Sequence, residues 1–353
     1  MTATVPTPSP APPGPLVEAH RLTCHFSPSR LFFRGPAVQA VTEFDISLSR
    51  GEAVGLVGES GSGKSTVGRL LLALLKPTAG RVLFEGADLA RLDKASQQRL
   101  RRRMQLVFQD PYSSLDPRRR VGDQIRDGLV IHDIVPARKQ ADRVTALLDQ
   151  VGLPASHADR FPHEFSGGQR QRIGIARALA TEPDFLVADE PVSALDVSIQ
   201  AQVLALLADL RTRLGLAMLF ISHDLPAVRH LCDRVIVMYL GRIMEEGPTQ
   251  AVFATPRHPY TAALLSAAPS LDITRRRTRI LLRGEPPSPV APPSGCVFRT
   301  RCPYALPACA ETVPALRPFG SPGHFKACIR DDIAAGSGAL APPQGTNPGL
   351  PGS

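Results

Sequence analysis

The sequence predicts an α/β fold built on a parallel sheet, followed by a small loop-rich segment. Short apolar runs that suit buried strands alternate with stretches of helical periodicity, an order typical of strands joined by helices. A Pro-rich stretch at 284–295 precedes a segment that carries four of the six cysteines. We therefore expect the following division: disordered tails at 1–15 and 334–353, a large α/β domain at 16–268, and a cysteine-bearing domain at 269–333.

The net charge of +9 raises the question of a nucleic-acid partner. Its Arg runs, at 100–104, 117–121 and 274–279, are short and scattered, and no aromatic residues that could stack on bases lie among them. The sequence therefore favours solvated Arg side chains that face acidic partners or anionic lipid, and no nucleic acid is expected.

Targeting features are also informative. The first 15 residues are rich in Pro and lack the basic start and the apolar core of a secretory signal. The apolar run at 70–75 is far too short to span a bilayer. We expect the protein to stay in the cytoplasm.

The stretch GESGSGKST at 58–66 lies between an apolar run at 52–58 and a helical pattern that Lys76-Pro77 should end. Strand, Gly-rich loop and helix form the context in which G-x-x-x-x-G-K-[ST] cradles phosphate, since curled backbone N–H groups and the helix N-terminus attract anions. Lys64 can reach the β- and γ-phosphates, and Ser65 can ligate Mg²⁺. A Gly-rich turn without a ligand is the alternative. The expected phosphate-binding residues are Gly58, Glu59, Ser60, Gly61, Ser62, Gly63, Lys64, Ser65 and Thr66.

A second apolar run, at 184–191, ends in two carboxylates. Such a pair is costly to bury unless a metal ion or a reaction uses it. Asp189 suits the outer shell of Mg²⁺, and Glu190 suits orienting and deprotonating an attacking water. An ordinary solvent-exposed strand end is the alternative.

Two further stretches place a residue where it can face a bound anion. Ser166 in FSGGQRQR suits a helix N-cap with two glycines behind it, which leaves a helix start open to an anion. His223 directly follows a third apolar run, at 217–222. At the carboxyl end of a parallel strand it can reach a γ-phosphate, although a lone His is more often structural.

These motifs together resemble the nucleotide-binding subunit of an ABC transporter. GESGSGKST resembles Walker A, FLVADE resembles Walker B, and FSGGQ resembles the signature motif with Phe165 in place of the commoner Leu. The remaining matches are SALD with Asp196 as the D-loop, SHD with His223 as the switch histidine, Gln109 as the Q-loop glutamine beside Mg²⁺, and Phe26 as the adenine-stacking aromatic. For Phe26, core packing is the alternative reading.

The resemblance implies a RecA-like core with a mixed sheet and a helical subdomain that carries the signature motif. It also implies a head-to-tail dimer with a second, similar ATPase or with itself. ATP would bind between Walker A of one subunit and the signature residues Ser166, Gly167, Gly168 and Gln169 of the other. The expected partners are two membrane permease subunits, which hold the ATPase at the cytoplasmic face, and an extracytoplasmic solute-binding protein.

Other stretches are similar to the peptide and nickel importers within this family, and closest to the F-type ATPase subunit of dipeptide and oligopeptide permeases. They are QDPYSSLDPR at 109–118, ADEPVSALDVSIQAQVL at 188–204, RHPYT at 257–261 and GEPPSPVAPPSGCVFRTRCP at 284–303. The similarity extends from residue 16 to about residue 330. The transported solute does not follow from it.

Four cysteines fall close to the C-terminus: Cys296, Cys302, Cys309 and Cys328. Their spacing matches neither paired C-x₂-C zinc sites nor a ferredoxin run, so iron–sulfur, zinc and unliganded thiols all stay open from spacing alone. A segment with little apolar content of its own favours a structural metal. Related importer subunits carry a C-terminal cluster on similar cysteines, so the resemblance implies a [4Fe–4S] cluster.

Two rival functions come from other classes. The first is a soluble ABC-class ATPase that acts on nucleic acid or ribosomes, which the basic charge favours. Such proteins usually carry a long insertion before the signature motif or a second ATPase domain, and this chain has one phosphate loop and a gap of about 100 residues. The second is a metal-binding interaction protein with a degenerate ATP site, which the presence of Gln109, Glu190 and His223 argues against.

Overall fold

Helices separate the three apolar runs that the sequence predicts as buried strands, and a group of strands precedes the first of these runs. The computed structural model describes residues 14–27, 29–30, 33–110, 114–267, 280–282 and 284–333. The strands are β1 (Val17–Phe26), β2 (Ser29–Arg30), β3 (Phe33–Arg34), β4 (Val38–Leu48), β5 (Ala53–Val57), β6 (Ala79–Phe84), β7 (Ala87–Asp88), β8 (Met104–Val107), β9 (Phe185–Asp189), β10 (Ala217–Ile221), β11 (Arg234–Tyr239), β12 (Arg242–Pro248), β13 (Arg317–Pro318) and β14 (Phe325–Lys326).

The helices are numbered separately, also in chain order. They are α1 (Lys64–Leu71), α2 (Lys94–Arg103), α3 (Val121–Ile131), α4 (Gln140–Gln150), α5 (Gly167–Leu179), α6 (Val197–Leu214), α7 (Leu225–Leu231), α8 (Thr249–Ala254), α9 (Pro259–Ala267) and α10 (Ala308–Glu311), with 3-10 turns η1 (Leu89–Arg91), η2 (Ala137–Lys139), η3 (Ala155–Asp159) and η4 (Pro162–Glu164). Most of the two predicted tails lies outside the described residues, as do residues 111–113 of the predicted QDPYSSLDPR stretch.

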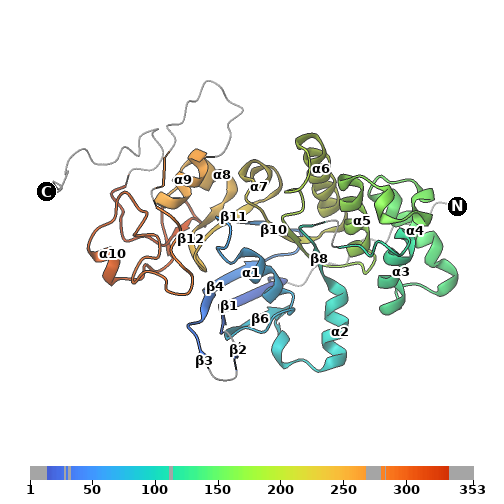
Figure 1. Ribbon diagram of the computed structural model, residues 1–353, viewed down its shortest axis with the longest axis horizontal. Helices are drawn as coiled ribbons and strands as arrows, with labels where there is room; N and C mark the ends of the chain where they lie inside the picture. The colour runs from blue at the N-terminus through green and yellow to red at the C-terminus, as the bar shows by residue number, and fades with distance from the viewer. Residues whose placement is uncertain are drawn as a thin grey trace.

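A mixed eight-stranded sheet runs through the molecule, in the order β13-β14-β12-β11-β5-β10-β9-β8 (Figure 1). The neighbours from β11 to β8 are parallel, whereas β12, β14 and β13 pair antiparallel. Every residue of β5, β9 and β10 is buried. Such continuous apolar runs are typical of parallel strands that are covered on both faces.

Two hydrophobic cores lie on the two faces of this sheet. Val54 and Leu56 of β5 point into the core that contains α1 and the second sheet, whose order is β4-β1-β6-β7. Ala53 and Val57 point into the opposite core, to which helices α3 to α9 contribute. The alternation follows from the two-residue period of a strand.

A helical region and a C-terminal segment lie at opposite ends of the molecule (Figure 1). The helical region consists of α3, α4 and α5, which contact one another. The C-terminal segment adds β14 and β13 to the edge of the main sheet, where Lys326 pairs with Glu245 of β12. This segment is therefore attached to the large α/β unit through a shared sheet.

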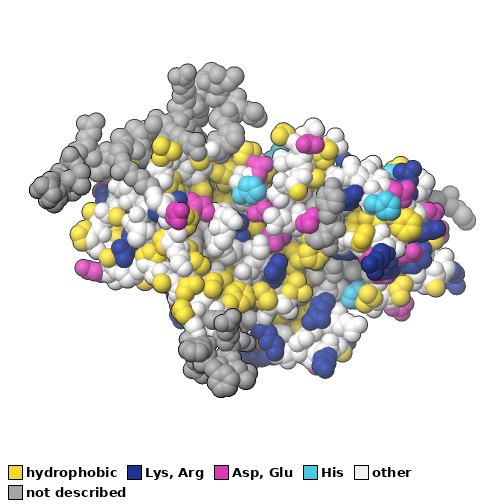
Figure 2. Space-filling model, in the orientation of Figure 1, with side chains coloured by type: hydrophobic (Ala, Val, Ile, Leu, Met, Phe, Trp, Pro, Cys, Tyr) yellow, Lys and Arg dark blue, Asp and Glu magenta, His cyan; other side chains and the backbone are white. Residues whose placement is uncertain are grey.

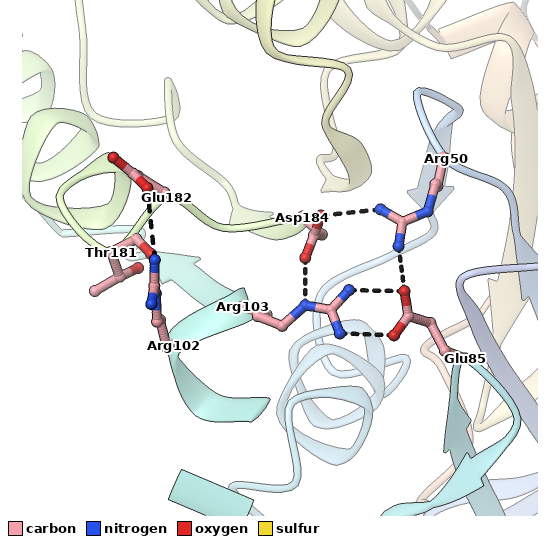
Figure 3. A network of polar contacts seen from close by, with 7 residues as sticks. All are labelled: Arg50, Glu85, Arg102, Arg103, Thr181, Glu182 and Asp184. Atoms are coloured by element: carbon pink, nitrogen blue, oxygen red, sulfur yellow. Dashed lines mark hydrogen bonds and ion pairs between the residues drawn. The ribbon is translucent and has the colours of Figure 1, made fainter. Parts of the chain in front are cut away.

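A ring of four charged side chains joins the two sheets near the start of β8 (Figure 3). Arg103 donates to Asp184 at 2.5 Å and to Glu85 at 2.6 and 2.7 Å. Arg50 donates to Asp184 at 2.9 Å and also pairs with Glu85. Glu85 belongs to the turn after β6 in the smaller sheet, and Asp184 directly precedes β9, so the ring connects elements of both layers.

Candidate functional site

The Gly-rich loop connects the carboxyl end of β5 to the first residue of α1. Gly58 has φ +155° and Gly63 has φ +100°, in the region that favours glycine. A Cβ at Gly58 would lie 2.1 Å from the carbonyl oxygen of Met238, and one at Gly63 would lie 2.0 Å from that of Ala40. Glycine is required here because neighbouring backbone approaches closely on both sides.

The helix after the loop is shorter than the sequence predicts. Its buried face contains Val67, Leu70 and Leu71, as expected, but α1 ends at Leu71 rather than at Lys76-Pro77. Ala73 has φ +52°, and the N–H groups of the next two residues reach back to the carbonyl of Arg69. This local turn stops the helix before its predicted end.

Lys64 is folded into the loop. Its side chain is buried, and its ammonium group donates to the carbonyl oxygens of Gly58 and Glu59, both at 2.8 Å. Burial lowers the pKa of Lys64, and the nearby carboxylates of Glu190, Asp189 and Glu59 act in the opposite direction. A desolvated cation inside a cradle of backbone N–H groups suits an anion such as a phosphate.

Ser65 and Asp189 meet beside the loop. The hydroxyl of Ser65 donates to the carboxylate of Asp189 at 2.9 Å, and Asp189 is buried at the end of β9. Burial raises the pKa of Asp189, and so does the charge of Glu190, while the Ser65 hydrogen bond lowers it. Hydroxyl and carboxylate oxygens form the donor set that Mg²⁺ prefers, so these residues fit the ion. Thr66 is partly buried in the same turn.

Glu190 follows Asp189 at the carboxyl end of β9 and lies between Gln109 and His223, two other residues that the sequence predicts for the site. Gln109 donates its amide N–H to Glu190 Oε2 at 2.9 Å, and His223 Nδ1 lies 3.4 Å from the same oxygen. Glu190 has φ +46°, a backbone conformation rare outside glycine that is often found at functional sites. The structure thus brings Gln109, Glu190 and His223 together next to Asp189.

The signature residues, Ser166 to Gln169, lie at the start of α5, away from the phosphate loop. Ser166 is the N-cap of α5, where its hydroxyl accepts the N–H of Gln169 at 3.3 Å and Gln169 Oε1 accepts the N–H of Ser166 at 3.0 Å. Gly168 is buried, and a Cβ there would lie 2.3 Å from Ile199. In Figure 1, α5 lies with the helical region, apart from α1. Gly167 begins the same helix, and Asp196 is the exposed N-cap of α6.

Phe26 is the last residue of β1, opposite Val38 of β4, and its side chain is 43% exposed. It is therefore not a core residue, which removes the packing alternative. Phe32, a second aromatic residue six positions later in the chain, lies outside the described residues.

The four C-terminal cysteines, Cys296, Cys302, Cys309 and Cys328, line one small enclosed cavity of about 10 Å³. All are free thiols. Burial raises the pKa of Cys296 and Cys328, and raises that of Cys302 to about 12. Among the residues that the structure describes, no three His, Cys, Asp or Glu side chains are arranged to hold a metal ion. The cavity has room for about one water, so a cluster would require these side chains to move outward.

Two contacts to the phosphate loop come from residues to which the sequence assigns no role. The hydroxyl of Tyr260 accepts the backbone N–H of Glu59 at 2.9 Å, and Arg301 donates to the Glu59 carboxylate at 2.7 Å. They lie 201 and 242 residues from Glu59 in the chain, so no local pattern could indicate them.

Basic side chains on the face shown in Figure 2 are scattered among acidic and apolar ones, with several around α2. They do not merge into one continuous basic surface on that face. Within the described part of the chain, no helix is long and apolar enough to cross a membrane.

Comparison with known proteins identifies two matching family models. Residues 41–193 match the ABC transporter model, and residues 244–309 match the model for the oligopeptide/dipeptide transporter C-terminal region. The second match covers Cys296, Cys302 and Cys309 and ends before Cys328.

Relatives of known name support both matches. The chain is 57% identical over 319 residues to a Brucella ovis protein whose name describes peptide import and ATP binding, with 90% of this chain and 99% of that one covered. It is 51% identical to the oligopeptide transport ATP-binding protein AppF of Bacillus subtilis, with 82% and 89% covered.

Solved structures agree on the fold. The ATP-binding cassette MJ0796, in a dimeric post-hydrolysis state bound to ADP and Pi, matches with a TM-score of 0.59 at 28% identity, covering 66% of this chain and 98% of that one. The cbiO1 protein of Clostridium perfringens matches with a TM-score of 0.60 at 29% identity, covering 68% and 91%. The chain has the ABC ATPase fold and belongs to the ATP-binding subunits of ABC transporters, in the group with the oligopeptide/dipeptide transporter C-terminal region.

Proposed function

We propose that this chain hydrolyses ATP to drive the import of peptides through membrane permeases. The observation that carries the proposal is the cluster at the carboxyl ends of β5, β9 and β10, where Lys64, Asp189, Glu190 and His223 lie close together beside the phosphate loop. Ligands bind at this edge in open α/β sheets. The peptide-import names of the relatives support the transported class.

Each residue at the edge has a chemical task in this proposal. The loop N–H groups and Lys64 bind the phosphates, and Ser65 and Asp189 hold Mg²⁺, which neutralises charge that develops on the phosphate oxygens. Glu190 takes the proton of the attacking water, while Gln109 and His223 fix the orientation of its carboxylate and face the γ-phosphate. Phe26, exposed at the end of β1, stacks on the adenine.

The ATP site is completed by another subunit. Ser166, the exposed N-cap of α5, and the first residues of that helix lie away from the loop of the same chain. A helix N-terminus that presents backbone N–H groups suits a phosphate brought by a partner. In this proposal two ATPase subunits bind head to tail, with Asp196 near their contact, and the dimer docks on the cytoplasmic face of two permeases supplied by an external solute-binding protein.

The cysteine segment is proposed to hold a [4Fe–4S] cluster on Cys296, Cys302, Cys309 and Cys328. The support is that four thiols from separate positions reach one cavity. Anaerobic purification should yield about four irons and four sulfides per chain, and Cys302→Ser should lower both. Protein without iron, or an unchanged iron content in the variant, would reject the cluster.

Co-purification tests the transport function. The Glu190→Gln protein, isolated from detergent-solubilised cells with Mg²⁺ and ATP, should retain two polytopic permeases and a second ATPase. Wild-type protein prepared without nucleotide is the matched control and should retain less of the second ATPase. Ribosomes or nucleic acid in place of membrane proteins would contradict the proposal.

A further inference from the structure

The C-terminal cysteine segment contacts the phosphate loop, and we infer that Arg301 is a positioning residue that holds this loop ready for nucleotide. Arg301 lies 242 residues beyond Glu59, its partner in the loop. The inference rests on the proposed function because it assumes that the loop binds the phosphates of ATP. It adds that nucleotide affinity depends on a side chain outside the ATPase motifs.

The ion pair between Arg301 and Glu59 is largely shielded from water. Arg301 Nη1 lies 2.7 Å from Glu59 Oε2, and the two side chains are 9% and 25% exposed. Pairs of this kind are screened less by salt than surface pairs are. Arg301 Nε is buried with no hydrogen-bond partner in the described part of the chain, so the carboxylate of Glu59 is the main compensation for the charge.

The backbone of Glu59 is held by Tyr260 of α9, which packs against the cysteine segment. Its N–H donates to the hydroxyl of Tyr260 at 2.9 Å, and Tyr260 is fully buried. The ring of Tyr260 lies 4.7 Å from that of Tyr239 and 5.2 Å from that of Phe298, between centroids. Phe298 is fully buried within the cysteine segment. Both the side chain and the backbone of Glu59 therefore rest on C-terminal residues.

A second anchor lies further along the loop. The N–H of Gly241, in the turn between β11 and β12, donates to the carbonyl oxygen of Ser62 at 3.0 Å. With Glu59 and Ser62 both fixed, the N–H groups between them have a defined direction before nucleotide arrives. Preorganisation of this kind raises affinity because less conformational freedom is lost on binding.

Substitution of Arg301 separates positioning from catalysis. Arg301→Gln should raise the Kd for a Mg²⁺-bound, non-hydrolysable ATP analogue about tenfold, which corresponds to about 1.4 kcal/mol. The KM for ATP should rise by a similar factor, while kcat at saturation stays within about twofold. Arg301→Lys, which keeps the charge but loses the planar fork, should recover part of the affinity.

Substitution of Glu59 excludes a purely electrostatic explanation. Loss of Arg301 also removes a positive charge near the phosphates, which alone would weaken binding. Glu59→Gln removes a negative charge, so an electrostatic effect alone would tighten binding, whereas loss of positioning should weaken it about threefold. The double variant should bind no more weakly than Arg301→Gln. Arg317→Gln is the matched control, since Arg317 pairs with Asp331 in the same segment and should leave Kd unchanged.

Three outcomes would be decisive. An unchanged Kd in Arg301→Gln, or tighter binding by Glu59→Gln, would overturn the positioning role. If Arg301→Gln does not fold, Arg301→Lys and Glu59→Gln carry the same test from either side of the pair. Wild-type protein that binds no nucleotide would instead defeat the proposed function, so the two failures are distinguishable.

Discussion

The two regions that meet at the phosphate loop are built in different ways. At the strand-end edge, Lys64 and Ser65 are adjacent in sequence, and Asp189 and Glu190 are adjacent in sequence, so short motifs define the chemistry. The C-terminal segment is attached by a few contacts between residues far apart in the chain, such as Arg301 with Glu59 and His324 with Glu245. The first region can be found from local patterns, while the second requires the folded chain.

The attachment of the C-terminal segment centres on Glu245, which is fully buried in β12. Its carboxylate accepts the N–H groups of Arg257 and His258 at 2.7 and 2.8 Å and contacts His324 Nε2 at 2.7 Å. Glu245→Gln should lower the free energy of unfolding by about 3 kcal/mol, because an amide N–H would face a backbone donor. Urea unfolding measures the change.

Glu43→Gln provides the matched control for Glu245. Glu43 pairs with the side chain of Arg21 rather than with a buried histidine, and its own side chain is 46% exposed. Loss of its charge should change stability by less than about 1 kcal/mol. Equal effects of the two substitutions would show that burial does not distinguish the attachment of the C-terminal segment from an ordinary surface pair.

Phosphate binding at the carboxyl ends of the strands depends on Lys64. Lys64→Ala should weaken ATP binding about 100-fold, because two or more charge-assisted hydrogen bonds to phosphate are lost. Equilibrium binding of a fluorescent ATP analogue measures the loss. Lys76, beyond the end of α1, supplies the control: Lys76→Ala should bind as wild type does. Unchanged affinity in Lys64→Ala would break the assignment of this edge as the phosphate site.

The ring of Arg50, Glu85, Arg103 and Asp184 in Figure 3 is intermediate in exposure between the buried Glu245 and the exposed Glu43. Its four side chains are about 30% exposed. Arg103→Gln should lower the free energy of unfolding by about 1 to 2 kcal/mol, because Arg103 contacts both Glu85 and Asp184. Arg101→Gln, on the exposed side of the same helix, is the control and should have almost no effect.

The effect of Arg103 should depend on pH. Hydrogen bonding to Arg103 lowers the pKa of Glu85 below its ordinary value of 4.5. A carboxyl group with a lowered pKa in the folded state stabilises the protein above its unfolded pKa and loses that contribution as the pH falls through the folded pKa. The difference in the free energy of unfolding between wild type and Arg103→Gln should therefore shrink below pH 4.5. A constant gap would show that the ring acts through packing alone.

The sequence predicts most of the fold and the composition of the edge, because strand periodicity and the Gly-rich loop are local signals. The buried strands β5, β9 and β10 are confirmed. The length of α1 was predicted wrongly, since helical spacing continues to Leu75 but the chain turns at Ala73. Tyr260 and Arg301 could not be predicted as loop contacts, because each depends on tertiary packing across more than 200 residues.

The most direct test of the central claim is ATP turnover by Glu190→Gln beside wild type. Glu190 is held by Gln109 and His223 at the end of β9 and is assigned as the base that activates water. The variant should bind ATP with affinity close to wild type and hydrolyse it about a thousandfold more slowly, since the amide cannot accept a proton. Turnover within tenfold of wild type would contradict the account, because the base would then lie elsewhere.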